Sequence, residues 1–460
     1  MYYFITVRAN IRCFFCIFVV GNIIIKVERL TIYEHMKRYL SFCIAMFVAI
    51  MSNAASATRD SIVVDSITGD VRKYKLTDNK ALKPLYWVYN YLANSNKRRS
   101  DVSYDGGFVF GPAYNINTGF AIGGGYSALY SFDKNDPKLQ KSIVNGFFQA
   151  SVKGIVAIGV EGHNFLKGDK QRFNYEFSFT HYPSAFWGIG CDTSLDNFYA
   201  NRMVSSKQLL LKLEGDYTWR LAKNLYFGPK IDFLYSYLYK TTDILPENEV
   251  MGEGKYEGYG NLMDYFLRLP DGSGSQPGSQ LALGLGVTLT YDSRDFATNA
   301  YKGHYFNLQQ LGFAPGINEY GFLTTDVKYQ FYTPLWKKCT LAFQAHGRFN
   351  YGNDVIPWIR LASTGNQGMG RGYFYGQYRD NNVMETQLEF RQRLIWRLGL
   401  VAWVGGINIF HDFKSIDMKQ TLPTYGFGVR WEFKPRVNVR VDWGFTKTGN
   451  SIVFNIGEAF

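Results

Sequence analysis

Histidine is the side chain in this 460-residue sequence with the widest capacity for chemistry, because it can ligate metals and transfer protons. The five histidines beyond residue 57 lie far apart, at His163, His181, His304, His346 and His411. They show no metal-ligand spacing, so no zinc site is indicated. No G-x-S-x-G pattern occurs, which argues against a patatin-type lipase. We therefore predict no catalytic residue, no metal and no cofactor.

Three short stretches carry charged side chains that could form ion pairs. Asp292, Arg294 and Asp295 lie close together ahead of Gly303, and Arg371 lies between two glycines. The third stretch places polar or charged groups at every second position: Glu385, Gln387, Glu389, Arg391 and Arg393. A guanidinium removed from water needs an acidic partner, so the elements that carry these groups decide what they do.

Alternation of apolar and polar residues is the pattern that would position these groups. Apolar residues alternate with Gly, Ala and Thr from Leu281 to Tyr291, and with Gly, Arg and Glu from Tyr425 to Phe433. A period of two is typical of β-strands, since successive side chains point to opposite faces. After Ala57 no apolar run reaches the roughly 18 residues of a membrane-spanning helix.

The two faces of these strands indicate the fold class. One face is apolar and aromatic, whereas the other is rich in Gly and in places charged. An apolar exterior around a polar lumen requires a closed barrel, because hydrocarbon tolerates no unpaired strand edge. The aromatic content of 17% suits the membrane interfaces. We predict an all-β fold, a transmembrane antiparallel β-barrel; a large soluble sandwich is the alternative.

The alternating segments predict about sixteen strands, an even number as in bacterial single-chain barrels. With both termini in the periplasm, the long connections 183–205, 239–278 and 352–382 face outward. Cys191 and Cys339 are the cysteines that follow residue 57, and they fall at opposite ends of the predicted barrel. Because a disulfide needs Cα atoms within about 7 Å, we predict two free thiols.

An export signal precedes the predicted barrel. Within residues 1–57, Met36-Lys37-Arg38 opens a basic stretch, an apolar stretch follows, and Ala55-Ser56-Ala57 offers a cleavage site. We expect translation to start at Met36; an unusually long basic segment is the alternative. Mature protein would begin at Thr58.

Residues 58–100 differ from the barrel, which we assign to residues 101–460. They are polar, with apolar residues at helical spacing from Leu85 to Leu92 behind Pro84. We predict a periplasmic linker with one short helix. The alternative is that this helix lies at the periplasmic membrane face or plugs the lumen.

The formal net charge of +12 carries little information about partners. Residues 1–57 hold six Lys/Arg and two Asp/Glu, so the remainder carries +8. No block of like charges is long enough for nucleic-acid binding, and we expect the basic residues to be spread over loops and lumen.

Three stretches resemble the BamA/TamA family of outer-membrane assembly barrels, the bacterial surface antigens. The stretch Tyr291 to Asp295, with Gly303, is similar to the family's acidic-and-arginine turn between strands eight and nine. Arg371-Gly372-Tyr373 resembles the tip of the long loop after strand eleven. The final strand runs to Phe460, as a terminal aromatic signal would. The resemblance covers roughly residues 105–460.

The resemblance implies a site inside the lumen. In the family this loop folds back into the barrel, where acidic groups on the inner wall hold its Arg. Glu389 matches the family's position on strand twelve, but Gly405 stands where strand thirteen usually carries Asp. Arg371 is therefore expected to rely on Glu389 alone.

Two departures from the family pattern bear on function. Residues 58–100 are too few for a periplasmic POTRA repeat, so the chain resembles a repeat-less branch. Glu458 stands in the terminal signal, where a hydrophobic residue is usual.

The resemblance implies a non-enzymatic helper in the Gram-negative outer membrane, whose first and last strands form a weak seam for client strands or lipid. Expected partners are outer-membrane lipid, nascent outer-membrane proteins or a periplasmic or outer-membrane protein, and no nucleic acid. A structural or channel-forming barrel, with the loop around Arg371 as plug, is the alternative; an outer-membrane hydrolase is the third hypothesis.

Overall fold

The computed structural model describes residues 61–64, 71–74, 104–115, 119–133, 139–352, 355–365, 368–394 and 397–460. They belong to two compact units, residues 1–94 and 95–460. In the first unit β1 (Ser61–Val64) pairs antiparallel with β2 (Val71–Tyr74), a hairpin that the sequence pattern does not predict. The expected signal region and the helix from Leu85 to Leu92 lie outside the described residues.

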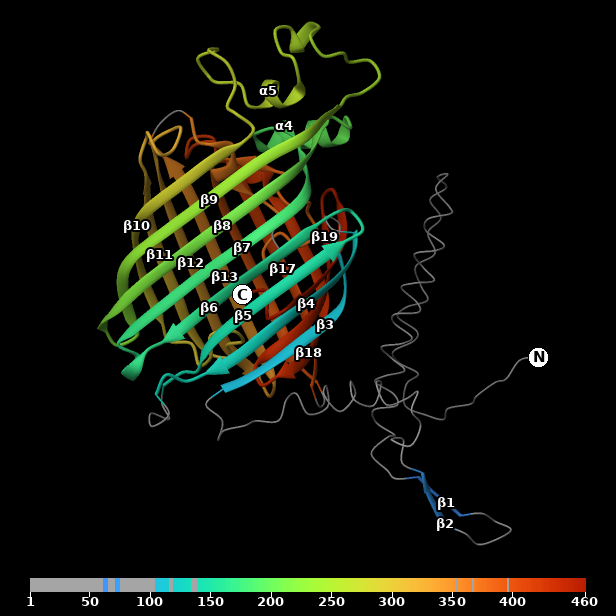
Figure 1. Ribbon diagram of the computed structural model, residues 1–460, viewed down its shortest axis with the longest axis vertical. Coiled ribbons are helices and arrows are strands. Elements are labelled where there is room, and N and C mark those ends of the chain that lie inside the picture. The colour runs from blue at the N-terminus through green and yellow to red at the C-terminus, as the bar shows by residue number, and fades with distance from the viewer. Residues whose placement is uncertain are drawn as a thin grey trace, which may run out of the picture. The chain divides into compact units, whose positions relative to one another are not determined.

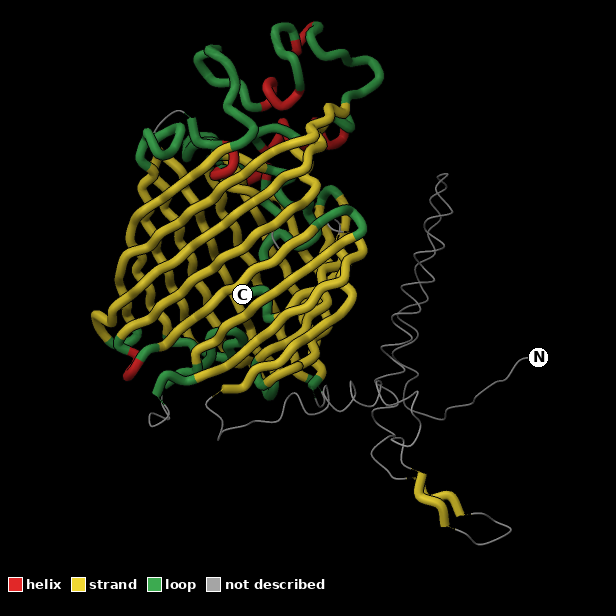
Figure 2. The backbone as a smooth tube through the Cα atoms, viewed as in Figure 1, coloured by secondary structure: helices red, strands yellow, loops and turns green. Residues whose placement is uncertain are grey.

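The second unit is a sixteen-stranded antiparallel sheet that curves into a barrel (Figures 1 and 2). Its strands are β3 (Tyr104–Asn115), β4 (Gly119–Tyr130), β5 (Ser142–Ser151), β6 (Val156–Phe165), β7 (Gln171–Phe186), β8 (Met203–Ala222), β9 (Leu225–Ile244), β10 (Gln280–Asp292), β11 (Gly303–Phe313), β12 (Phe322–Trp336), β13 (Cys339–Tyr351), β16 (Asn382–Arg393), β17 (Leu398–Phe410), β18 (Leu422–Lys434), β19 (Val437–Thr446) and β20 (Gly449–Ile456). Each pairs with its neighbours along the chain, and the sheet ends at β3 and β20. The predicted all-β fold and strand number are confirmed.

The side chains of the sheet are arranged inside out compared with a soluble protein. On β18 the outward residues Tyr425, Phe427 and Val429 are 52%, 53% and 44% exposed, whereas the alternate residues Thr424 and Arg430 are buried. Apolar groups on the outside and polar groups within fit a barrel in hydrocarbon. The soluble-sandwich alternative is therefore wrong.

The two ends of the barrel differ. At one end, two-residue turns join β8 to β9, β12 to β13 and β18 to β19, and the second residue of each has positive φ: Asn224, Lys338 and Arg436. At the other end lie the three long connections, as expected from the strand count. We take the short-turn end as periplasmic. Cys191 and Cys339 are both free and lie at opposite ends, which confirms the predicted thiols.

The outward connections carry most of the helical segments. These are α4 (Cys191–Tyr199), α5 (Leu262–Phe266), η3 (Gly254–Tyr256), η4 (Trp358–Arg360) and η5 (Met418–Gln420), whereas η2 (Lys167–Asp169) lies in a periplasmic turn. The connection between β13 and β16 also holds two short paired strands, β14 (Ala362–Ser363) and β15 (Arg379–Asp380). Among the described residues, no helix is both long and apolar enough to cross a membrane.

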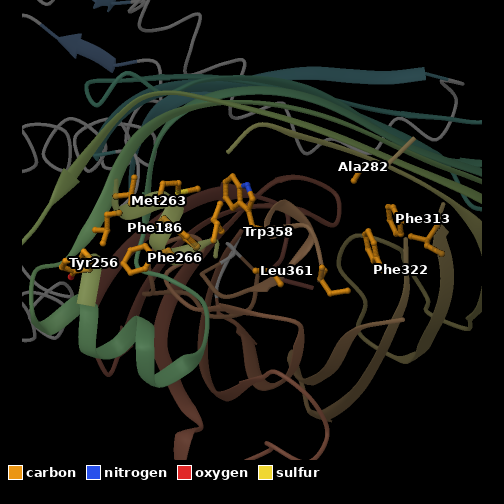
Figure 3. Close-up of a cluster of buried hydrophobic side chains, with 14 residues drawn as sticks. Phe186, Tyr256, Met263, Phe266, Ala282, Phe313, Phe322, Trp358 and Leu361 are labelled. Atoms are coloured by element: carbon orange, nitrogen blue, oxygen red, sulfur yellow. The ribbon is translucent and has the colours of Figure 1, made fainter. Parts of the chain in front are cut away.

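A buried apolar cluster caps the outward end of the barrel, and we call it the outer cap (Figure 3). It joins Met263 and Phe266 of α5 to Phe186 at the end of β7 and to Trp358 of η4. Arg360, which follows Trp358 in η4, donates two hydrogen bonds to Asp232 of β9, at 3.0 and 2.7 Å. The connection between β9 and β10 is therefore packed onto the barrel rim.

Candidate functional site in the barrel lumen

Glycine gives the Arg371 loop the backbone that carries it into the lumen. Gly370 and Gly372 have φ of +63° and +119°, a conformation that other residues rarely adopt. The loop backbone then lies against β19, because a Cβ at Gly444 would be 2.3 Å from the carbonyl oxygen of Arg371. The hydroxyl of Thr424 donates to the same oxygen at 3.1 Å. The loop tip is thus fixed by its main chain as well as by its side chain.

The Arg371 side chain is buried against two carboxylates and an aromatic ring. It forms an ion pair with Glu389 of β16, and its Nη1 lies 2.7 Å from Oδ2 of Asp442 on β19. The guanidinium carbon lies 3.6 Å from the ring centroid of Trp403 on β17. Arg371 is 1% exposed and Glu389 is fully buried, so the pair expected between them is present inside the barrel.

The expectation that Arg371 relies on Glu389 alone is wrong, because Asp442 supplies a second acid. At Gly405 there is no room for the Asp that the family usually carries, since a Cβ there would lie 2.5 Å from the backbone oxygen of Thr386. Trp403 on the same strand gives the guanidinium an aromatic face instead. The acid lies two strands further along the sheet.

The carboxylates around Arg371 are shared by further arginines. Glu389 accepts a hydrogen bond of 2.8 Å from Nε of Arg391. Asp442 accepts bonds of 2.6 Å from Arg430 and 2.7 Å from Arg440. These residues form one charge network on β16, β18 and β19, in which each carboxylate neutralises several guanidinium groups.

The end of the chain turns into the lumen, in contrast to the expected final strand to Phe460. β20 ends at Ile456, and Gly457 follows with a φ of +94°. Phe460 packs against Tyr332, and its main-chain oxygen accepts a 2.8 Å hydrogen bond from Arg391. The side chain of Glu458 is buried and lies 2.8 Å from Arg430 in an ion pair. A charged residue at this position is therefore no defect, since it faces arginine rather than lipid.

The turn motif braces the periplasmic end of the barrel. Arg294 donates two hydrogen bonds to Asp292, at 2.9 and 3.1 Å, and Oδ1 of Asp295 accepts from the backbone of Tyr301 at 2.9 Å. Oδ2 of Asp295 lies 2.7 Å from Nη2 of Arg436 in the turn between β18 and β19. Burial alone would raise the pKa of Asp295, but these hydrogen bonds lower it below its ordinary value.

Gly303 is required by the geometry of this turn. Its φ is +112°, and a Cβ would lie 2.4 Å from the carbonyl oxygen of Ser293. The motif therefore has a visible structural use, which is to hold the β10–β11 turn across the mouth. It does not meet Arg371, so the structure does not unite the two motifs into one site.

The two edges of the sheet, β3 and β20, form a seam. Among the described residues no backbone ladder joins them. The two strands nevertheless lie close to each other. An ion pair also crosses the seam, since Nζ of Lys434 on β18 lies 2.7 Å from Oδ1 of Asp105 on β3. Nζ also donates to the main-chain oxygen of Asp105 at 3.3 Å, and the Lys434 side chain is 3% exposed. We call this contact the seam latch.

Comparisons with known proteins bear on this fold. The family model described as the Omp85 superfamily domain matches residues 109–460. The comparison with curated proteins finds no match.

Among solved structures, BamA from Haemophilus ducreyi lacking POTRA domains 1–3 is 12% identical with a TM-score of 0.46, over 76% of this chain and 69% of that one. CdiB from Acinetobacter baumannii is 10% identical with a TM-score of 0.44, over 78% and 60%. CdiB from Escherichia coli is 12% identical with a TM-score of 0.45, over 77% and 63%. The chain thus spans less than two thirds of the two CdiB proteins.

Proposed function

The chain belongs to the Omp85 superfamily, and from that premise we propose that it is a non-enzymatic helper that inserts proteins into the outer membrane through the seam between β3 and β20. Membership places the barrel in the Gram-negative outer membrane, among barrels that insert or secrete proteins. The insertion role, the client and the use of the seam are our proposal.

The observation that supports this role is the seam itself. Edge strands present unpaired N–H and C=O groups that can template another strand. In a closed barrel every edge is paired, but β3 and β20 lack a ladder among the described residues. A client strand could therefore pair with one edge without first breaking a row of backbone hydrogen bonds. The seam latch is the contact that it would have to displace.

The same proposal extends to the chain's organisation and partners. Residues 1–57 would be an export signal, and residues 58–100 a periplasmic linker. The partners would be outer-membrane lipid and nascent outer-membrane proteins. A periplasmic or outer-membrane protein would be a further partner.

A channel with the Arg371 loop as plug is the second candidate. The position of that loop in the lumen favours it. The outer cap weighs against it, because a solute would have to pass both the buried cluster around Trp358 and the loop held by Glu389 and Asp442. Both the outer cap and the Arg371 loop would have to move before a solute could pass.

Two measurements on the purified chain separate the candidates. In liposomes, the helper is expected to accelerate folding of a urea-denatured model barrel, scored by protease protection, relative to protein-free liposomes. In planar bilayers it is expected to give no stable conductance. Steady single-channel conductance without accelerated folding would overturn the helper role in favour of the channel.

A further inference from the structure

We propose that the periplasmic end of the lumen holds a binding site for a phosphate group. A cavity of about 210 Å³ lies there, between the ends of β13, β16, β17 and β18 and the β10–β11 turn. Its lining includes five cationic side chains and two carboxylates. The cations are Lys338, Arg391, Arg393, Arg397 and Arg430, and the carboxylates are Glu432 and Glu458. We call it the arginine cavity.

The cationic side chains that line the arginine cavity outnumber its carboxylates, five to two. Both oxygens of Glu458 are already used, one by Arg430 at 2.8 Å and the other by Asn438 at 2.5 Å. Arg393 stacks on Tyr301, with its guanidinium carbon 4.3 Å from the ring centroid, and has no carboxylate partner among the described residues. Positive charge is in excess on this wall.

Two buried guanidinium groups also have one nitrogen each without an acceptor. Arg391 and Arg430 are 7% and 3% exposed, yet Nη1 of Arg391 and Nη2 of Arg430 have no hydrogen-bond partner among the described residues. A buried donor without an acceptor costs free energy. The nearby acids already serve other groups, since Glu389 pairs with two arginines and Asp442 with three. A bound anion would provide the missing acceptors.

The chemistry of the lining favours phosphate over other anions. Guanidinium forks bind phosphate oxygens in pairs, and a tetrahedral group offers acceptors to several forks that approach from different directions. The volume is below the roughly 300–1,000 Å³ of sites for drug-sized ligands, so it suits a headgroup and excludes an acyl chain. The phosphate could be free or the headgroup of a phospholipid. This inference does not depend on the proposed insertion role.

The test uses the folded full-length chain in an uncharged detergent and phosphate-free buffer. Titration calorimetry with pyrophosphate is expected to give saturable one-site binding that weakens as salt rises. Arg393→Gln with Arg397→Gln should weaken it by about tenfold or more, since two forks are lost. Neither residue is an ion-pair partner of Glu389 or Asp442, so the buried network around Arg371 stays intact. Lys170→Gln with Lys223→Gln, which removes two exposed charges from other periplasmic turns, is the matched control and should leave the affinity unchanged.

A second arm identifies the source of the phosphate. Dihexanoyl phosphatidic acid that displaces pyrophosphate, while dihexanoyl phosphatidylcholine does not, would assign the site to an anionic lipid headgroup. Pyrophosphate binding without displacement would assign it to free phosphate. Absence of saturable binding by both probes, or equal affinity in the arginine variant and the wild type, would overturn the site. Heat-modifiable gel migration of every variant verifies that the barrel is folded.

Discussion

At the level of single residues, Arg371 holds its loop in the barrel lumen through two ion pairs. Its guanidinium contacts Glu389, Asp442 and the Trp403 ring. Removal of Arg371 therefore leaves two buried carboxylates without this partner, whereas after removal of Glu389 the guanidinium still has Asp442. Breaking a buried ion pair costs on the order of 3–5 kcal/mol, less where lumen water reaches the charges. We expect Arg371→Ala to lower the temperature of the heat-modifiable gel shift more than Glu389→Gln does.

Exposed Arg268 in the β9–β10 connection provides the control, and Arg268→Ala should leave the shift unchanged. A double-mutant cycle of Arg371→Ala with Asp442→Asn should give a coupling energy of about 0.5–3 kcal/mol. Strictly additive losses would mean that the Arg371–Asp442 contact contributes nothing.

Part of this site could be predicted from residue types and part could not. The alternation on β16 places Glu389 on the lumen face, and the loop motif points to Arg371. Asp442 also lies on a lumen face by alternation, but nothing in a sequence says that β19 passes beside a loop inserted before β16. That proximity depends on the curvature of the closed sheet and on the close approach allowed by Gly444.

At the scale of the element, the outer cap is tied down by Glu249. This carboxylate binds Arg202 at 2.8 Å, Lys255 at 2.8 Å and Tyr256 at 2.6 Å. The Arg202 hydrogen bonds lower the pKa of Glu249 from 4.5 to about 2. Because the folded pKa is depressed, this stabilisation is complete above pH 4.5 and is lost as the pH falls toward 2.

Hydrogen exchange of the α5 backbone, corrected for intrinsic rates, should therefore accelerate as the pH drops through that window. Glu249→Gln should show faster exchange already at pH 7, whereas Glu257→Gln, which changes an exposed neighbour, should match the wild type. Exchange in α5 that is unaffected by both pH and Glu249→Gln would contradict the role given to this carboxylate.

The strands were more predictable than the connections. The strands follow a period of two because one face meets lipid and the other the lumen, and the predicted number of about sixteen matches the observed sheet. The strand count places the connection 239–278 on the outward side, but it does not show that α5 packs into the outer cap. The signal for it is the short apolar run Leu262 to Leu267, which lacks the length for a periodicity. The inward turn after Ile456 is marked by Gly457 and Glu458 alone, too few residues to establish a pattern.

At the level of the whole molecule, we expect the seam latch to stabilise the closed barrel relative to a barrel that is open between β3 and β20. With no ladder between β3 and β20 among the described residues, loss of one buried ion pair should shift that balance measurably. We expect Lys434→Gln to increase labelling of a cysteine placed at Phe108 by a maleimide in the bilayer. The charge exchange Lys434→Asp with Asp105→Lys should restore the wild-type rate. Equal labelling in all three proteins would show that the latch does not hold the seam.

The most direct test of insertion through the seam is to lock it. In a background with Cys191 and Cys339 replaced by Ser, cysteine pairs along 108–110 of β3 and 452–454 of β20 are oxidised, and folding of a model barrel in liposomes is measured. A control pair at Leu211 and Tyr235, directly opposed on β8 and β9, carries the same cross-link in the far wall. Oxidation of the seam pair is expected to abolish accelerated folding and reduction to restore it, whereas the control pair is expected to be active in both states. Full activity with the seam locked would contradict it.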